Sequence, residues 1–118
     1  MKVIVCVSSG TDDPTRAALG MLAAKAAVAQ KHDVIVWLQG EGVNVANKNI
    51  YEKIQGINMP PMKDIVSTLI AAKVPLWVCE ACAKGRNVTQ ENALETALFK
   101  NMADYVTAAL EADKNLTV

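Results

Sequence analysis

Residues 2–7 of the chain are Lys2-Val3-Ile4-Val5-Cys6-Val7, and residues 34–38 are Val34-Ile35-Val36-Trp37-Leu38. Both runs are rich in β-branched residues and end in polar or glycine-containing segments, which is typical of buried strands. The segment between them, from Pro14 to about Lys31, is rich in alanine and predicts a helix with Asp13 as its N-cap. A strand, a helix and a second strand at this spacing predict a βαβ unit, whose two strands are parallel.

The rest of the chain continues this alternation. A helix that begins at Pro60-Pro61 is predicted because its apolar residues recur at helical spacing on one face: Met62, Ile65, Val66 and Leu69. Residues 43–61 are expected to form a long polar loop with a short helix near Ile50. Further strands are predicted at Val74–Val78, Ala97–Phe99 and Asn115–Val118, and a last helix at Asn101–Glu111. Together these elements predict an α/β fold: a single three-layer domain over residues 1–118, with a mainly parallel open sheet of about five strands and helices on both faces.

The charges of the chain are balanced and evenly spread. Its 118 residues carry 12 basic and 12 acidic side chains. Nucleic-acid binding and polybasic membrane anchoring both need concentrated positive charge, so neither is expected. No apolar stretch is long enough for a membrane span or for the core of a signal peptide. We therefore expect a cytoplasmic protein with three unpaired cysteines, whose partner is a small molecule or another protein.

Polar or glycine-containing segments follow three of the predicted strands. They contain Ser8, Ser9 and Gly10 after the first strand, Gln39, Gly40 and Gly42 after the second, and Cys79 and Cys82 after the third. In open parallel sheets, ligands bind beyond the carboxyl ends of the strands, where such segments meet. The sequence therefore predicts a binding site at this edge of the sheet, with Cys79 in it.

Cys79 is the first candidate for chemistry because a strand ends and a helix is expected to begin at this residue. A helix N-terminus stabilises a thiolate and lowers the pKa of the cysteine. Lys84 and Arg86 follow within two helical turns and would add to this effect, whereas Glu80 would oppose it. The alternative is a buried, inert cysteine at the end of a strand.

Cys82 completes a C-x-x-C pattern, for which three interpretations stay open. It could resolve a disulfide in a dithiol oxidoreductase, contribute half of a zinc site, or pack as a small apolar residue. For zinc, only Cys6 and His32 remain as further candidates, and Cys6 lies within a predicted core strand. The chain contains no nucleophile elbow, no phosphate-binding loop and no complete dinucleotide fingerprint.

Several short segments, in this order and spacing, resemble the DsrE/DsrF-like sulfur-relay proteins, which include the Tus relay subunits. The resemblance covers most of the chain. It rests on the opening strand, Thr15-Arg16-Ala17, His32-Asp33-Val34, Glu41-Gly42-Val43, Val74-Pro75-Leu76-Trp77-Val78-Cys79, Cys82-Ala83 and Ala112-Asp113-Lys114.

The resemblance implies a DsrE-like α/β domain, assembly into homo- or hetero-oligomers, often trimers or hexamers, and a persulfide-carrying cysteine. That cysteine matches Cys79, and Cys82 matches a second cysteine found in part of the family. Two positions depart from the family pattern. Lys31 stands where a glycine commonly ends the first helix, and Arg86-Asn87-Val88 replaces an Arg-Gly-Ile-like turn close to Cys79.

The expected function is that of a sulfur carrier with sulfurtransferase-type chemistry. Cys79 would accept sulfane sulfur from a donor protein or small persulfide and pass it to an acceptor, with no metal or organic cofactor required. A homo-oligomer, trimer or hexamer, is expected from the resemblance. Two alternatives are a dithiol redox protein that uses Cys79 and Cys82, and a non-catalytic oligomeric protein that binds a small ligand.

Overall fold

The computed structural model describes residues 1–118 and contains one sheet of five parallel strands in the order β4-β3-β2-β1-β5. This confirms the predicted α/β fold, and all five strands lie close to the predicted segments. In chain order the elements are β1 (Lys2–Val7), α1 (Pro14–Ala29), β2 (Asp33–Leu38), the 3-10 helices η1 (Gly40–Ala46) and η2 (Tyr51–Lys53), α2 (Met62–Ala71), β3 (Leu76–Cys79), α3 (Glu80–Gly85), β4 (Ala97–Lys100), α4 (Met102–Glu111) and β5 (Lys114–Thr117).

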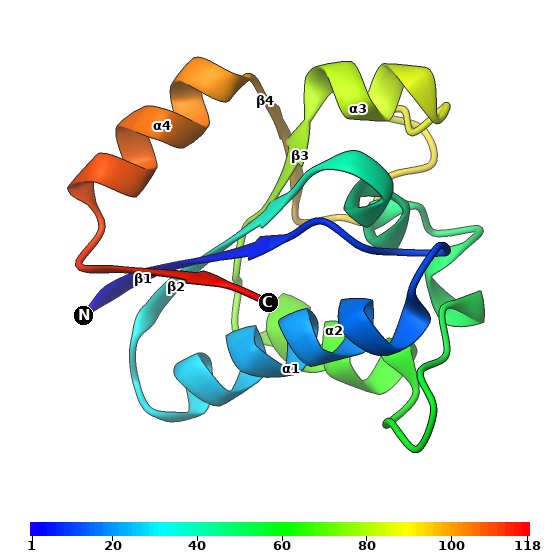
Figure 1. The fold of residues 1–118 in the computed structure, drawn as a ribbon, viewed down its shortest axis with the longest axis horizontal. Coiled ribbons are helices and arrows are strands. Elements are labelled where there is room, and N and C mark those ends of the chain that lie inside the picture. Colours follow the sequence, from blue (N-terminus) through cyan, green and yellow to red (C-terminus); the bar gives the residue numbers. More distant parts are fainter.

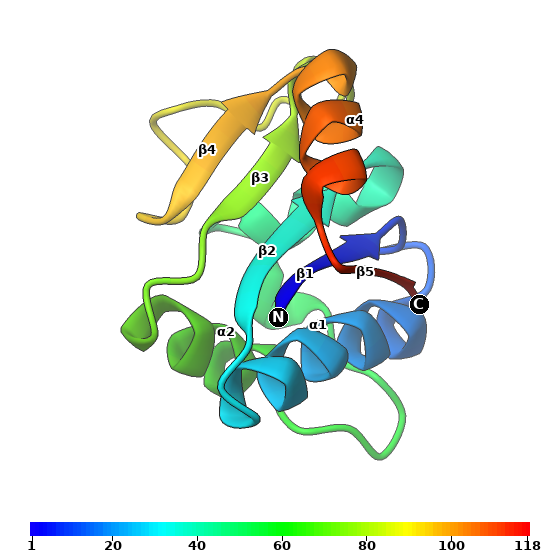
Figure 2. The same ribbon diagram turned by 90° about the vertical axis from the view of Figure 1, so that its left-hand side faces the viewer.

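Helices cover both faces of the sheet, as predicted. Helices α1 and α2 lie on one face, and α3 and α4 on the other (Figure 1). In Figure 2, α4 crosses the sheet between its two edge strands, from β4 to β5. None of the helices, of which α1 with 16 residues is the longest, has the length and apolar character required to span a bilayer.

The core lies mainly between the sheet and the pair α1 and α2. Alternate residues of the central strands point to this face, and Val5, Val7 and Leu38 are fully buried there. Helix α1 approaches β1 closely because Gly20 has no side chain: a Cβ at this position would lie 2.8 Å from a methyl carbon of Val7. The predicted apolar face of α2 is also confirmed, since Met62, Ile65, Val66 and Leu69 are all buried.

The segment 43–61 is more ordered than the predicted polar loop. Its first part belongs to η1, in which Val43, Val45 and Ala46 are fully buried, and the predicted short helix near Ile50 is present as η2. Backbone hydrogen bonds from Leu94 to Ala46 and from Lys48 to Asn92, both 2.8 Å long, attach it to the segment before β4. The prediction was wrong because three buried apolar residues offset a polar average composition.

Three helices end at a residue in the left-handed region that is not glycine. Lys31, Lys73 and Asn87 have φ angles of 70°, 60° and 54°. In each case the next N–H group donates to a carbonyl of the last helical turn, which is the bonding of a Schellman motif. The family departure at Lys31 therefore changes the residue and leaves the helix ending intact.

Candidate functional site

The three segments predicted to form a site do meet at the carboxyl edge of the sheet, because β3, β2 and β1 are neighbours. The segments after β1 and β2 are packed tightly against each other. A Cβ at Gly42 would overlap the carbonyl oxygen of Val7, and a Cβ at Gly10 would overlap that of Glu41. These two glycines thus allow close backbone approach between the segments.

The polar side chains of these two segments bind one another. Gln39 donates to the hydroxyl oxygen of Ser8 over 3.1 Å and accepts a 2.8 Å hydrogen bond from the indole N–H of Trp37. Ser9 is buried, and Gly40 has a φ of 53°, which a left-handed turn requires. The structure therefore gives these predicted binding residues a defined role in holding the edge together.

Cys79 is the last residue of β3 and the N-cap position of α3. Only 6% of its surface is exposed. Burial is the largest influence on its thiol and raises the pKa, while hydrogen bonds from the backbone N–H groups of Cys82 and Ala81 lower it. The Cys82 side chain raises it further, and the net pKa of Cys79 lies above its ordinary value. The helix N-terminus is thus where it was predicted, but the predicted lowering of the pKa is wrong for this closed arrangement, because burial outweighs it.

Cys82 lies one helical turn further on, half-buried, and its thiol is hydrogen-bonded to that of Cys79. The other residues weighed for a zinc site lie elsewhere. Cys6 is buried in β1, 3.9 Å from the hydroxyl oxygen of Ser8, and His32 contacts the amino group of Met1 over 3.0 Å at the opposite edge of the sheet. The structure therefore pairs Cys79 with Cys82 and separates both from His32.

Arg86 bridges α3 and η1. Its Nε donates to Glu41 over 2.7 Å, and its Nη1 donates to the carbonyl oxygen of Cys82 over 3.2 Å. Asn44 donates to the second carboxylate oxygen of Glu41 over 3.3 Å. Arg86 is therefore neutralised by a carboxylate, and the exposed Lys84 points to solvent from α3; the groups that set the pKa of Cys79 are burial, Ala81 and Cys82.

The turn after α3 keeps the conformation that glycine would favour. Asn87 adopts the left-handed region, which asparagine tolerates better than most residues, and Val88 is buried and donates to Ala83 over 2.9 Å. The second family departure therefore preserves the turn beside Cys79.

Sequence reasoning missed Lys100, the register partner of Cys79 on β4. Its ammonium lies 5.0 Å from the centroid of the Trp77 ring. Trp77 is in turn paired with Trp37, whose ring stacks on Tyr105 with centroids 4.6 Å apart. Cys79 thus adjoins a face of the sheet that carries aromatic rings and one cation. The register of β4, which local sequence does not specify, was the signal that could have found Lys100.

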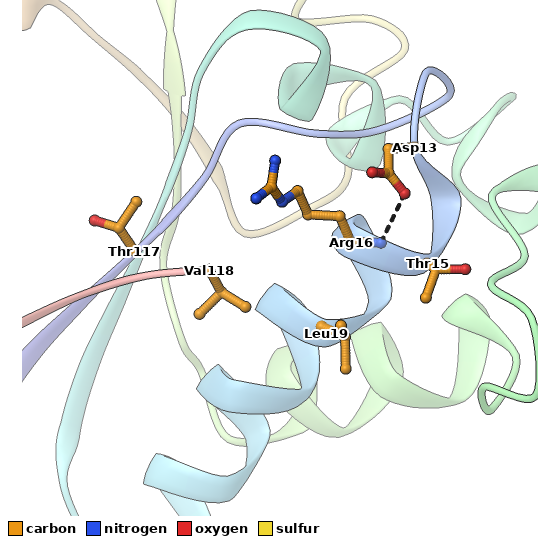
Figure 3. A pocket seen from close by; sticks show the side chains of 6 residues that line it. All are labelled: Asp13, Thr15, Arg16, Leu19, Thr117 and Val118. Carbon is orange, nitrogen blue, oxygen red and sulfur yellow. Dashed lines mark hydrogen bonds between the residues drawn. The ribbon is translucent and has the colours of Figure 1, made fainter.

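Two open grooves lie on the far side of the molecule from this cysteine pair. The larger, of about 660 Å³, lies between the start of α1 and the end of β5, where Asp13 accepts a hydrogen bond from the N–H of Arg16 (Figure 3). The smaller, of about 370 Å³, lies between the second half of α1 and β5. Cys79 and Cys82 line neither groove, so Cys79 is reached through a narrow opening in the surface.

Solved structures share this fold at low sequence identity. The YchN protein from E. coli superposes with a TM-score of 0.85 at 18% identity, over 100% of this chain and 99% of that chain. The protein of unknown function MTH1491 from Methanobacterium thermoautotrophicum gives 0.76 at 16%, over 99% and 98%. The protein of unknown function BT1422 from Bacteroides thetaiotaomicron gives 0.61 at 17%, over 99% and 94%.

The sequence comparison is more specific about kinship. No curated protein matches the chain by sequence. The profile of the DsrE/DsrF-like family, in contrast, matches residues 1–118. This agrees with the parallel five-stranded sheet and with the segments that suggested the resemblance. The chain belongs to the DsrE/DsrF-like family.

Proposed function

We propose that this protein is a sulfur carrier that holds sulfane sulfur as a persulfide on Cys79 and passes it to an acceptor. The observation that carries the proposal is the position of the Cys79 thiol, under two backbone N–H groups of α3 and beside a second thiol. These donors stabilise negative charge on sulfur, and a persulfide is anionic more readily than a thiol. Family membership adds to this support.

The chemistry needs no external oxidant. The Cys79 thiolate attacks the outer sulfur of a donor persulfide, a new S–S bond forms on Cys79, and the donor thiolate leaves with the electron pair. An acceptor thiolate then removes the outer sulfur by the same exchange. Alternatively, Cys82 attacks the inner sulfur, which forms a Cys79–Cys82 disulfide and releases the outer sulfur as hydrogen sulfide ion.

The buried thiol implies that loading involves a local opening. Cys79 is covered by α3, a helix of only six residues, and such short elements open at a small cost in free energy. A donor that holds α3 open would expose the thiol and remove the burial that raises its pKa. Donor and acceptor proteins or small persulfides in a reducing cytoplasm fit this scheme.

Intact-mass spectrometry after incubation with a persulfide donor tests the proposal. We expect a gain of one sulfur atom, removed by reductant and located on Cys79. The Cys79→Ser variant should show no gain, whereas Cys82→Ser should still load. If Cys79 neither gains sulfur nor reacts with alkylating reagents, a non-catalytic ligand-binding protein becomes the better account.

A dithiol redox protein is the second candidate, and the hydrogen bond between the two thiols favours it. Two cysteines in contact one helical turn apart can form a disulfide. Such a protein would lose two hydrogen atoms on oxidation and would not retain sulfur. The same mass measurement therefore separates the two functions.

We further propose a homo-oligomer, a trimer or hexamer as in related proteins. The outer face of α4 carries an exposed apolar stripe of Met102, Val106 and Leu110, with exposed fractions of 53%, 46% and 82%. Leu98 on the edge strand β4 adds to it with 48% exposed. Apolar surface of this kind is typical of subunit interfaces.

A further inference from the structure

Lys100 is the residue of β4 that lies directly beside Cys79 in the sheet. The parallel register pairs the two residues, and register partners project from the same face. The ammonium of Lys100 lies over the ring of Trp77, two residues before Cys79 on the same face of β3. A positive charge is therefore held next to the approach to the thiol.

This charge has no carboxylate partner. The chain contains two ion pairs, Lys63 with Glu52 and Arg86 with Glu41, and Lys100 is in neither. The other charges near Cys79 are Glu80 and Lys84 of α3, both exposed to solvent. Lys100 is also absent from the groups that shift the pKa of Cys79, so its charge acts on what approaches the thiol.

We propose that Lys100 is a specificity-determining residue that makes Cys79 react preferentially with anionic sulfane-sulfur compounds, such as persulfide anions and thiosulfate, over neutral ones. This inference rests on the proposed sulfur-carrier function and names its substrate class. With thiosulfate, the Cys79 thiolate attacks the outer sulfur, the donor S–S bond breaks, and sulfite leaves with the electron pair. The charges balance without an oxidant.

The size of the effect follows from electrostatics at an accessible site. A unit charge about 4 Å from an anion in water contributes an attraction that corresponds to about a fivefold rate difference. Salt reduces such attractions strongly when the Debye length falls below the distance between the charges. The stacked position over Trp77 favours a fixed ammonium, so less conformational freedom is lost when an anion arrives.

Two alkylating reagents with the same leaving group test this charge effect. Iodoacetate is an anion and iodoacetamide is neutral, and both are followed at Cys79 in a Cys82→Ser background. In Lys100→Met, which keeps an unbranched apolar stem against Trp77, we expect the iodoacetate-to-iodoacetamide rate ratio to fall about fivefold. Lys100→Arg should retain the ratio, and so should the matched control Lys84→Met. The pH profile with iodoacetamide should be unchanged by Lys100→Met.

The outcomes that overturn the inference are specific. An unchanged ratio in Lys100→Met would do so, as would a wild-type ratio that does not respond to salt. Loading with thiosulfate and with a neutral trisulfide, read by intact mass, separates this inference from the carrier function. If Lys100→Met loads from both as the wild type does, the role of Lys100 fails and the carrier stands. If the wild type loads from neither, the carrier fails, while the alkylation ratio still reports on Lys100.

Discussion

The Cys79 thiol is subject to opposing influences. Burial raises its pKa, and the N–H groups of Cys82 and Ala81 lower it. Burial dominates, so the resting protein holds the thiol in its neutral, less reactive form. Sulfur chemistry at this residue is therefore coupled to exposure of the thiol, which links the reactivity of Cys79 to the short helix that covers it.

A raised pKa makes a clear statement about pH. The rate of Cys79 alkylation by iodoacetamide in the wild type should keep rising above pH 9.0, the ordinary value for this thiol. The unfolded chain releases this proton at a lower pH than the folded protein does. The thiol's contribution to stability is therefore complete below that value and is lost as pH rises through it. A pH–rate profile read at Cys79 with its midpoint at or below 9.0 would contradict this account.

At the residue scale, the sequence could predict what local pattern determines. An apolar run that ends at Cys79 placed this residue at the carboxyl edge, and the C-x-x-C spacing placed Cys82 one turn away. The charge balance of the site could not be predicted, because Arg86 is neutralised by Glu41, which lies 45 residues earlier. The direction of the pKa shift depended on burial, which is a tertiary property.

At the scale of elements, α3 and η1 form the wall of the site. The two are joined by the ion pair of Arg86 with Glu41, in which about one third of each side chain is exposed. Arg86 also holds the carbonyl oxygen of Cys82. The pair therefore stabilises the closed position of the helix that covers Cys79.

Removal of this ion pair should make Cys79 more accessible. Partly exposed ion pairs contribute up to about 1 kcal/mol, so Glu41→Ala is expected to speed alkylation of Cys79 by iodoacetamide about fivefold. The matched control is Glu52→Ala, which removes the exposed pair with Lys63 away from this site and should leave the rate unchanged. Equal rates in both variants would show that the ion pair does not limit opening.

Elements with a regular pattern were predictable, and those fixed by tertiary contacts were not. The strands and α1, α2 and α4 follow from apolar periodicity and from caps such as Asp13 and Asn101, whose side chains bond the first helical turn. In η1, burial of Val43 and Val45 depends on packing against α3 and β3. Lys100 could not be placed because its position depends on the register of β4.

At the scale of the whole molecule, two surfaces distinguish this chain. The carboxyl edge carries Cys79, and the outer face of α4 carries the apolar stripe defined above. Because α4 begins directly after Lys100, an assembly formed through the stripe would bring a neighbouring subunit close to the approach to Cys79. Assembly and sulfur transfer would then be coupled.

A charge placed in the stripe should disrupt the proposed oligomer. Leu110 is 82% exposed, so Leu110→Asp leaves the folded subunit intact but buries a charge at any interface that covers it. Light scattering coupled to size-exclusion chromatography should show an oligomer for the wild type and a monomer for the variant. Ile57→Asp, at an equally exposed apolar residue outside the stripe, should remain oligomeric. A monomeric wild type would refute the proposed assembly.

The central claim is that Cys79 carries a sulfur atom from donor to acceptor. The most direct test loads the protein with an isotopically labelled outer sulfur, removes the donor, adds an acceptor thiol and follows the label by mass spectrometry. We predict that the label leaves Cys79 and is recovered on the acceptor, in the wild type and in Cys82→Ser alike. Release of all label as free sulfide with formation of a Cys79–Cys82 disulfide, or failure of Cys79 to take up label, would contradict the account.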